Sequence, residues 1–257
     1  MTRRVVVTGL GVISPIGSQK ENFWNALISG KSGIKEATAF NTSNFNVHNV
    51  AEVKDFNPQE FIPADFIKKY GRAAQYAMAA SNFALKDSLI NLEDVDPLRV
   101  GVALGTTMGE TQVFESLVEK YIKNELDISS KDLISQYPSF RLSSSVAEFL
   151  NLRGPNSIFP TACSAGNYAI SFGFDCIKDN KADIMFCGGV DVISIIAFTG
   201  FARMLSISPD ICRPFDKDRK GIIVGEGCGM LLLEELESAK KKKSTYIRRG
   251  FRLWSKL

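Results

Sequence analysis

The chain has 257 residues, of which 45% are hydrophobic and 23% are charged. A chain of this length and composition can bury enough apolar surface to fold without disulfides or bound metals. Its net charge of +3, from 31 basic and 28 acidic residues, is too balanced to indicate nucleic acid or an anionic membrane as the main partner. The apolar stretch near the amino terminus is short and broken by glycine, so we expect neither a signal peptide nor a membrane span.

The cysteines are odd in number and none forms a CxxC pair: Cys163, Cys176, Cys187, Cys212 and Cys228. This pattern indicates reduced thiols in a cytoplasmic protein. All but Cys163 are expected to be small buried hydrophobic residues. The single histidine, His48, lies in a polar stretch, so the sequence predicts no metal site and no cofactor.

The first predicted element is a buried strand over residues 5–8, followed by a turn at Gly9 to Gly11. These glycines do not match a dinucleotide-binding loop, because Gly17 comes too late and Pro15 intervenes. Residues 21–29 have a helical pattern with large apolar side chains on one face. Residues 35–63 show no clear period and predict a long irregular excursion.

Residues 65–85 predict one helix whose alanine density suits close packing on all sides. Residues 99–105 predict a buried strand that ends in the turn GTTMGE. Helices are expected over 115–126 and 140–150. A short extended segment at 157–160 leads into TACSAG and a helix over 165–177, and strands follow at 183–190 and within 222–234. Apolar strands that alternate with helices predict an α/β fold, a sheet covered by helices on both faces.

Cys163 is the candidate nucleophile, because it stands between a strand-like segment and an apolar helix. Helix amino termini present unpaired N–H groups and a partial positive charge, which favour a thiolate. The small neighbours Ala162, Ala165 and Gly166 would let a bulky substrate approach the sulfur. Spacing alone leaves a buried structural cysteine equally open.

Six segments resemble, in the same order, those of type II β-ketoacyl-acyl-carrier-protein synthases. They are VVVTGLGVISPIG, QYAMAASNFAL, GTTMGE, the stretch around Cys163, CGGVDV and CRPFDKDRKGIIVGEGCGMLLLEEL. The resemblance runs from Arg3 to about Lys243. It implies the amino-terminal half of a thiolase-like fold, with a mixed sheet covered by helices.

The resemblance also implies a decarboxylating condensation in fatty-acid synthesis. An acyl chain would pass from acyl-carrier protein to Cys163 as a thioester, and the carbanion from malonyl-carrier protein would attack it. Further site residues follow from the family's positions. Met108, Phe198 and Phe201 would line the acyl pocket, although the two phenylalanines equally suit a plain core. Lys68, Lys69 and Arg203 would dock the acidic carrier protein, although all three equally suit ordinary surface charge.

In the family, two histidines with a supporting lysine come from a carboxy-terminal half, and His48 lies in the wrong segment to replace either. The chain as written is therefore expected not to complete condensation. Full-length relatives are homodimers. Because this chain corresponds to only the amino-terminal half of such a subunit, its own pairing is doubtful. The resemblance defines a domain over residues 1–243 and a foreign tail over 244–257. Read one nucleotide out of frame with freely chosen codons, the tail gives KAHIYAEVLGYGVS, which suggests a frameshift. A genuinely short protein is the alternative.

Three other functions remain open. A polyketide-type ketosynthase is close, because SPDICRPFD and GTTMGE also resemble those enzymes. A non-catalytic partner or remnant would leave all five cysteines equally inert. A thiolase that uses coenzyme A fits less well, because the PFDKDR segment and the docking positions resemble synthases.

Overall fold

The computed structural model describes residues 3–128 and 130–241. In that part of the chain no helix is long and apolar enough to cross a membrane. The strands are β1 (Val5–Ser14), β2 (Gly17–Ser18), β3 (Lys35–Glu36), β4 (Asn49–Val50), β5 (Val100–Gly105), β6 (Asn156–Phe159), β7 (Ile184–Asp191) and β8 (Gly227–Glu235). The α-helices are α1 (Lys20–Ile28), α2 (Ala64–Lys69), α3 (Arg72–Ser88), α4 (Thr111–Ile122), α5 (Ser130–Gln136), α6 (Phe140–Phe149), α7 (Ala165–Lys178), α8 (Ile195–Arg203) and α9 (Leu236–Lys241).

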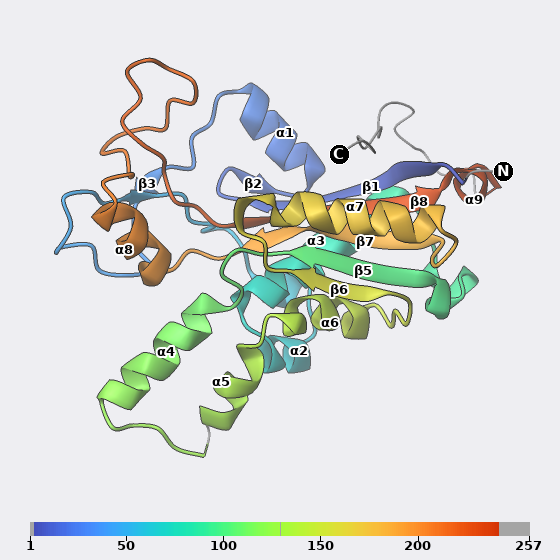
Figure 1. Cartoon of the computed structure of the whole chain (residues 1–257), viewed down its shortest axis with the longest axis horizontal. Helices are drawn as coiled ribbons and strands as arrows, with labels where there is room; N and C mark the ends of the chain where they lie inside the picture. Colours follow the sequence, from blue (N-terminus) through green and yellow to red (C-terminus); the bar gives the residue numbers. More distant parts are fainter. Residues whose placement is uncertain (1–2, 129, 242–257) are drawn as a thin grey trace.

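Six strands form one mixed sheet in the order β2-β1-β8-β7-β5-β6. Strand β5 is parallel to both neighbours, with Gly105 opposite Phe159 of β6 and Gly189 of β7. Strand β8 is antiparallel to β7 and to β1. The carboxyl ends of the three parallel strands β5, β6 and β7 therefore meet at one edge, on the left in Figure 1.

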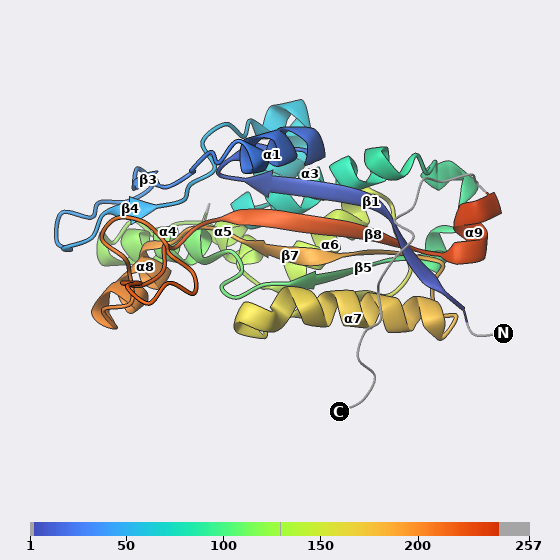
Figure 2. The ribbon, with the colours of Figure 1, turned by 90° about the horizontal axis from the view of Figure 1, so that it is seen from above.

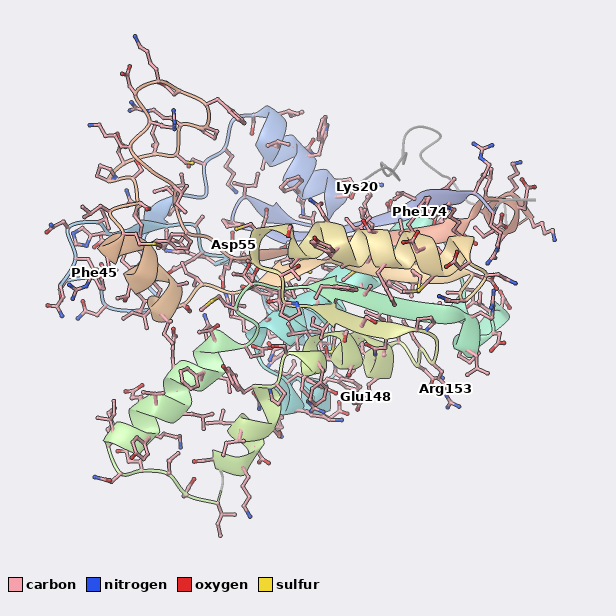
Figure 3. The ribbon with its side chains drawn as sticks, viewed as in Figure 1. Lys20, Phe45, Asp55, Glu148, Arg153 and Phe174 are labelled. Carbon is pink, nitrogen blue, oxygen red and sulfur yellow. The ribbon has the colours of Figure 1, made fainter. Side chains whose placement is uncertain are left out.

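Helices lie on both faces of the sheet. Helices α3 and α6 lie on one face and α7 lies on the other (Figure 2). Figure 3 labels Glu148 on α6 and Phe174 on α7. The core between the sheet and α3 contains side chains such as Met78, Phe83 and Leu232. A second core under α7 contains Ala169, Ile177 and Met185. This arrangement confirms the predicted α/β fold with a helix-covered mixed sheet.

Strand β1 differs from the prediction because it continues through Gly9 and Gly11 to Ser14, where a turn was expected. The glycines serve close packing. A Cβ on Gly9 would collide with the carbonyl oxygen of Ala84, and one on Gly11 with that of Ala80. Both carbonyls belong to α3, so the missing side chains let the helix backbone lie directly on the strand.

The single helix predicted over 65–85 is two helices, which break at Tyr70 and Gly71. The break lies where the Glu110 carboxylate accepts hydrogen bonds from Ala73 N and Ala74 N at 3.1 and 2.7 Å. These N–H groups belong to the first turn of α3 and would be paired within the helix if it were continuous. The predicted dense packing of the alanine-rich helix is confirmed, since Ala73, Ala77 and Ala80 are fully buried.

Helix α1 forms as predicted, but apart from the half-buried Phe23 its large apolar side chains are exposed. Trp24 is 58% exposed and Ile28 is 64% exposed, while Ala26 is buried. Helices α5, α8 and α9 were not predicted from the sequence pattern.

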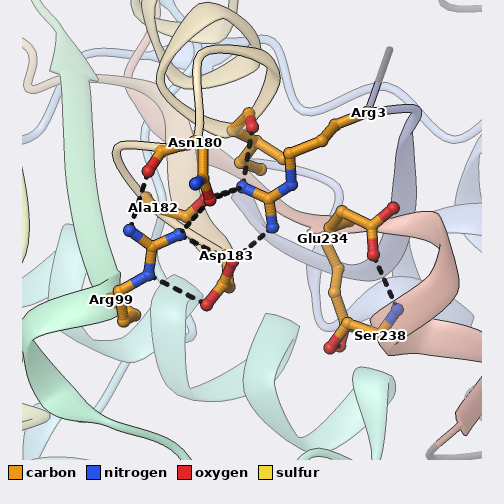
Figure 4. A network of polar contacts seen from close by, with 9 residues as sticks. Arg3, Arg99, Asn180, Ala182, Asp183, Glu234 and Ser238 are labelled. Carbon is orange, nitrogen blue, oxygen red and sulfur yellow. Dashed lines mark hydrogen bonds and ion pairs between the residues drawn. The ribbon is translucent and has the colours of Figure 1, made fainter. Parts of the chain in front are cut away.

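A polar network closes the edge of the sheet opposite the carboxyl ends of the parallel strands. Asp183, just before β7, forms ion pairs with both Arg3 and Arg99, and both guanidinium groups also donate to the Asn180 side chain (Figure 4). The Arg99 and Arg3 side chains hold the pKa of Asp183 below its ordinary value. The network joins the start of β1, the start of β5 and the α7–β7 connection.

Candidate active site

The predicted nucleophile lies at the sheet edge where the parallel strands end. Cys163 is exposed and sits in a short 3-10 turn, Ala162–Ser164, directly before α7. The turn follows β6, which ends at Phe159. Cys163 therefore lies at the amino end of a 14-residue helix, whose first N–H groups have no partner within the helix. The Cys163 side chain is exposed to solvent.

The turn before Cys163 is held in an unusual backbone conformation. Ala162 has a φ of 54°, in the left-handed region that residues with a Cβ seldom adopt. Such strained residues persist only where the surrounding structure fixes them. Gly105, the last residue of β5, provides part of that surrounding, because a Cβ there would collide with the backbone of Ala165 and Gly166.

Met108 lies in the turn that follows β5, next to the nucleophile segment. Thr106 N donates to Phe159 O at 3.1 Å, which ties the start of this turn to the end of β6. The Asp191 carboxylate at the end of β7 accepts from Thr106 Oγ1 and Met108 N, both at 2.9 Å. The Met108 side chain is half-buried.

Glu226 is a buried carboxylate that joins three segments distant in sequence. It accepts from Arg72 of α3 at 2.9 and 3.2 Å, from Tyr76 Oη at 3.0 Å and from Val53 N at 2.9 Å. Ile193 N, between β7 and α8, donates to it at 3.3 Å. Burial and the neighbouring Glu226 carboxylate raise the pKa of the Tyr76 phenol.

A cleft of about 1120 Å³ opens between α4 and this Glu226 centre. Arg72, Glu226, Phe114 and Ile196 contribute to its walls, and Cys163 does not. A smaller apolar groove of about 390 Å³ runs beside the first turns of α7, where Gly166 and Ile170 line it. It is therefore the smaller groove that borders the helix following the candidate nucleophile.

Glu110 is the second buried carboxylate of this region, and only 1% of its surface is exposed. Burial raises its pKa to about 7, although the N–H groups of Ala74 and Ala73 oppose the shift. Glu110 directly precedes α4, so its carboxylate fastens the base of that helix to the amino terminus of α3.

The two predicted pocket phenylalanines lie on α8. Phe198 is fully buried and packs against Phe40 and Phe45, with ring centroids 5.3 and 5.2 Å apart. Phe201 is partly buried and borders the same cluster. These contacts are those of a core, which is one of the two alternatives the sequence left open.

The three predicted docking residues are exposed but come from separate parts of the molecule. Lys68 and Lys69 end α2, and Arg203 ends α8. In Figure 1, α8 lies beyond the carboxyl edge of the sheet and α2 lies beneath the sheet. Lys69 forms an ion pair with Glu148.

The other cysteines divide into two groups. Cys176, Cys187 and Cys228 are buried, as predicted, and burial raises the pKa of each thiol. Cys212 was predicted to be buried and that prediction is wrong, because Cys212 lies in an exposed loop after α8. Within residues 3–128 and 130–241, no group of three or more His, Cys, Asp or Glu side chains could hold a metal ion.

Asp191, Glu226 and Glu110 lie in segments that carry the family resemblance, but the sequence predicted no role for them. The sequence does carry a signal for Asp191. This residue directly follows the predicted buried strand over 183–190, so its carboxylate is expected at the end of that strand. The bonding of Glu226 to Val53 and Ile193 had no sequence signal, since these contacts join segments more than thirty residues apart.

The fold and the helix-start cysteine define an α/β domain of the thiolase-like class. The chain belongs to the β-ketoacyl synthase family, because the model of the beta-ketoacyl synthase N-terminal domain matches residues 2–239. It is 36% identical to 3-oxoacyl-acyl-carrier-protein synthase 2 of Synechocystis sp. over 92% of this chain and 59% of that relative. It is likewise 36% identical to the synthase 2 of Coxiella burnetii, over 95% of this chain and 60% of that relative.

One similar solved structure is the ishigamide ketosynthase/chain length factor, with a TM-score of 0.91 and 37% identity over 96% of this chain and 62% of that one. Another is a type II polyketide acyl-carrier protein in complex with its ketosynthase, with a TM-score of 0.82 and 26% identity over 96% of this chain and 61% of that one. The chain thus has the amino-terminal half of a ketosynthase fold and spans about 60% of the length of these curated relatives.

Proposed function

We propose that this chain supplies the acyl-accepting half of a 3-oxoacyl-acyl-carrier-protein synthase and that Cys163 is its nucleophile. The observation that carries the proposal is the exposed sulfur at the start of α7, within a family of condensing enzymes. Residues 1–243 are the proposed domain. The predicted tail, 244–257, lies outside the described residues.

The proposed step is a thioester exchange. The sulfur of Cys163 attacks the carbonyl carbon of an acyl-carrier-protein thioester and a tetrahedral oxyanion forms. The bond to the carrier sulfur then breaks, the carrier thiolate leaves and takes a proton from solvent, and the acyl group remains on Cys163. Backbone N–H groups near the start of α7 are the donors available to the oxyanion.

Decarboxylation and carbon–carbon bond formation are not part of the step proposed for Cys163. The only histidine, His48, lies in the irregular excursion, where its Nδ1 is 3.0 Å from Thr42 Oγ1. We therefore expect acylation of the chain without net condensation when malonyl-carrier protein is added.

Lys68, Lys69 and Arg203 are the proposed docking residues for acyl-carrier protein, since all three are exposed cations. Met108, Phe198 and Phe201 are the proposed lining of the acyl pocket. The core contacts of Phe198 weaken the case for that residue. A polyketide-type ketosynthase is the second candidate function, favoured by the 37% identity to the ishigamide ketosynthase/chain length factor.

The test is acyl transfer followed by intact-mass spectrometry. The chain is incubated with hexanoyl-acyl-carrier protein, and we expect one added hexanoyl group that is absent in Cys163→Ala and present in Cys212→Ala. Cys212 is the matched control because it is the other exposed cysteine among the five, all of which lie in the described part. Acylation lost in Cys212→Ala, or no acylation at all, would overturn the proposal. The same assay with a ketoacyl-loaded polyketide carrier protein separates the two candidate functions by the faster donor.

A further inference from the structure

The Asp191 carboxylate, at the end of β7, accepts hydrogen bonds from the turn that follows the neighbouring strand β5. Asp191 is the last residue of β7 and pairs in register with Gly227 of β8. Its side chain instead reaches the turn after β5. There Oδ1 accepts from Thr106 Oγ1, Thr107 N and Met108 N, each at 2.9 Å, and Oδ2 is 3.1 Å from Thr107 N.

The same turn is fixed at other points. Thr106 Oγ1 accepts from Gly109 N at 2.8 Å, and Gly109 has a φ of 63°. Thr111 Oγ1 donates to Met108 O at 2.7 Å. The N–H and the C=O of Met108 are therefore both held by side chains, one from β7 and one from α4. Because both peptide groups are fixed, the direction in which the Met108 side chain leaves the backbone is fixed as well.

This turn also borders the nucleophile segment. Thr106 N is bonded to Phe159 O, four residues before Cys163, and Gly105 lies against Ala165, two residues after it. A shift of the turn would therefore move groups that contact the chain on both sides of Cys163.

We propose that Asp191 is a positioning residue that sets acyl-chain selectivity by fixing the Thr106–Gly109 turn and, with it, Met108. The inference rests on the proposed function, because it takes the acyl group to be accepted at Cys163. Asp191 touches no reacting atom in this account and acts through the turn. The charge of Asp191 matters because a carboxylate oxygen can accept several hydrogen bonds from consecutive donors.

The test compares transfer to Cys163 from hexanoyl- and dodecanoyl-acyl-carrier protein. We expect Asp191→Ala to change the ratio of the two rates by about fivefold or more, in the same direction as Met108→Ala. Because Asp191 acts through Met108, the double variant should show no further change. Asp191→Asn keeps one acceptor oxygen but places an amide donor opposite Thr107 N, so it should shift the ratio in the same direction as Asp191→Ala and by a smaller factor. Asp179→Ala, an exposed carboxylate at the other end of α7, should leave the ratio unchanged.

An equal fall in both rates in Asp191→Ala would overturn the inference, because it is the result of a merely structural role. Additive effects of Asp191→Ala and Met108→Ala would also overturn it. If Asp191→Ala does not fold, Thr106→Val replaces it, since that variant removes the hydroxyl between Asp191 and Gly109 with little change in shape. If the wild-type chain accepts neither acyl group, the proposed function itself is overturned. If Asp191→Ala accepts both acyl groups with the wild-type ratio of rates, only the role of Asp191 is overturned.

Discussion

Gly105 lies directly against Ala165, so the end of the central parallel strand touches the start of the helix that follows Cys163. A Cβ on Gly105 would meet helix backbone, which cannot move aside as a flexible side chain can. The position of the candidate nucleophile is therefore set by the absence of a side chain on the neighbouring strand.

Gly105→Ala is expected to push the start of α7 off the sheet. The predicted loss of unfolding free energy is about 1–3 kcal/mol, the usual cost of overpacking, and alkylation of Cys163 should change with it. Urea denaturation and iodoacetamide labelling measure the two effects. Gly200→Ala is the matched control, because no atom lies within 4 Å of a Cβ built there. It should leave labelling of Cys163 unchanged and stabilise α8 by up to about 1 kcal/mol.

Ala162→Gly should be neutral or stabilising, because glycine adopts the positive φ of 54° without the cost that a Cβ brings. The same change at Ala169, which is buried in the interior of α7, should lower the unfolding free energy by about 1 kcal/mol. Equal destabilisation by the two substitutions in urea denaturation would contradict the left-handed conformation of Ala162.

Removal of the Glu226 carboxylate should be among the more damaging single changes. Its side chain is 1% exposed and pairs with Arg72, which is 35% exposed. Glu226→Ala should cost on the order of 3 kcal/mol of unfolding free energy, since it leaves a partly buried guanidinium without its partner. The exposed pair of Glu119 and Lys123 provides the control, and Glu119→Ala should leave the denaturation midpoint unchanged. Similar midpoints for the two variants would rule out a structural role for Glu226.

Glu110 predicts a pH dependence of a definite sign. Its pKa is about 7 in the folded chain and 4.5 as the ordinary value, so the folded state binds the proton more tightly. The stability it contributes is complete below about pH 4.5 and is lost as the pH rises through about pH 7. Relative to Glu110→Gln, the wild-type chain should lose about 2–3 kcal/mol of unfolding free energy between about pH 5 and about pH 8. Urea denaturation across that range measures the difference.

The slope with pH is the quantity to compare in that experiment. The amide nitrogen that Glu110→Gln introduces cannot accept from Ala73 N, so the substitution adds a loss of unfolding free energy that does not change with pH. Parallel curves for the two proteins would show that Glu110 does not titrate in this range.

Strands β5, β7 and β8 and the principal helices could be predicted from the sequence because their apolar runs are long and bounded by clear breaks, whereas the two-residue strands β2, β3 and β4 were not predicted. The alanine-rich pattern of α3 and the strand at Val100–Gly105 are examples. Strand β1 could not be read correctly, because Gly9 and Gly11 look like a turn until the carbonyls of Ala84 and Ala80 are placed against them. Local patterns do not carry that contact, which joins residues about seventy positions apart.

The candidate site was predicted in part for the same reason. Cys163 has a local signature, a small-residue turn before an apolar helix, and the structure places it there with an exposed sulfur. The bonds from Asp191 to the Thr106–Met108 turn depend on the strand order, which places β7 beside β5. Burial of Cys212 was predicted because nothing local distinguishes it from the buried cysteines. Its exposure depends on a loop that no periodic pattern predicts.

The most direct test of the central claim compares two cysteines within one molecule. The rate of iodoacetamide alkylation is measured for Cys163 and Cys212 by peptide mass spectrometry, both thiols being exposed. If the helix start activates the sulfur, Cys163 should react about tenfold faster than Cys212 at neutral pH. Equal rates, or faster reaction of Cys212, would contradict the assignment of Cys163 as the nucleophile.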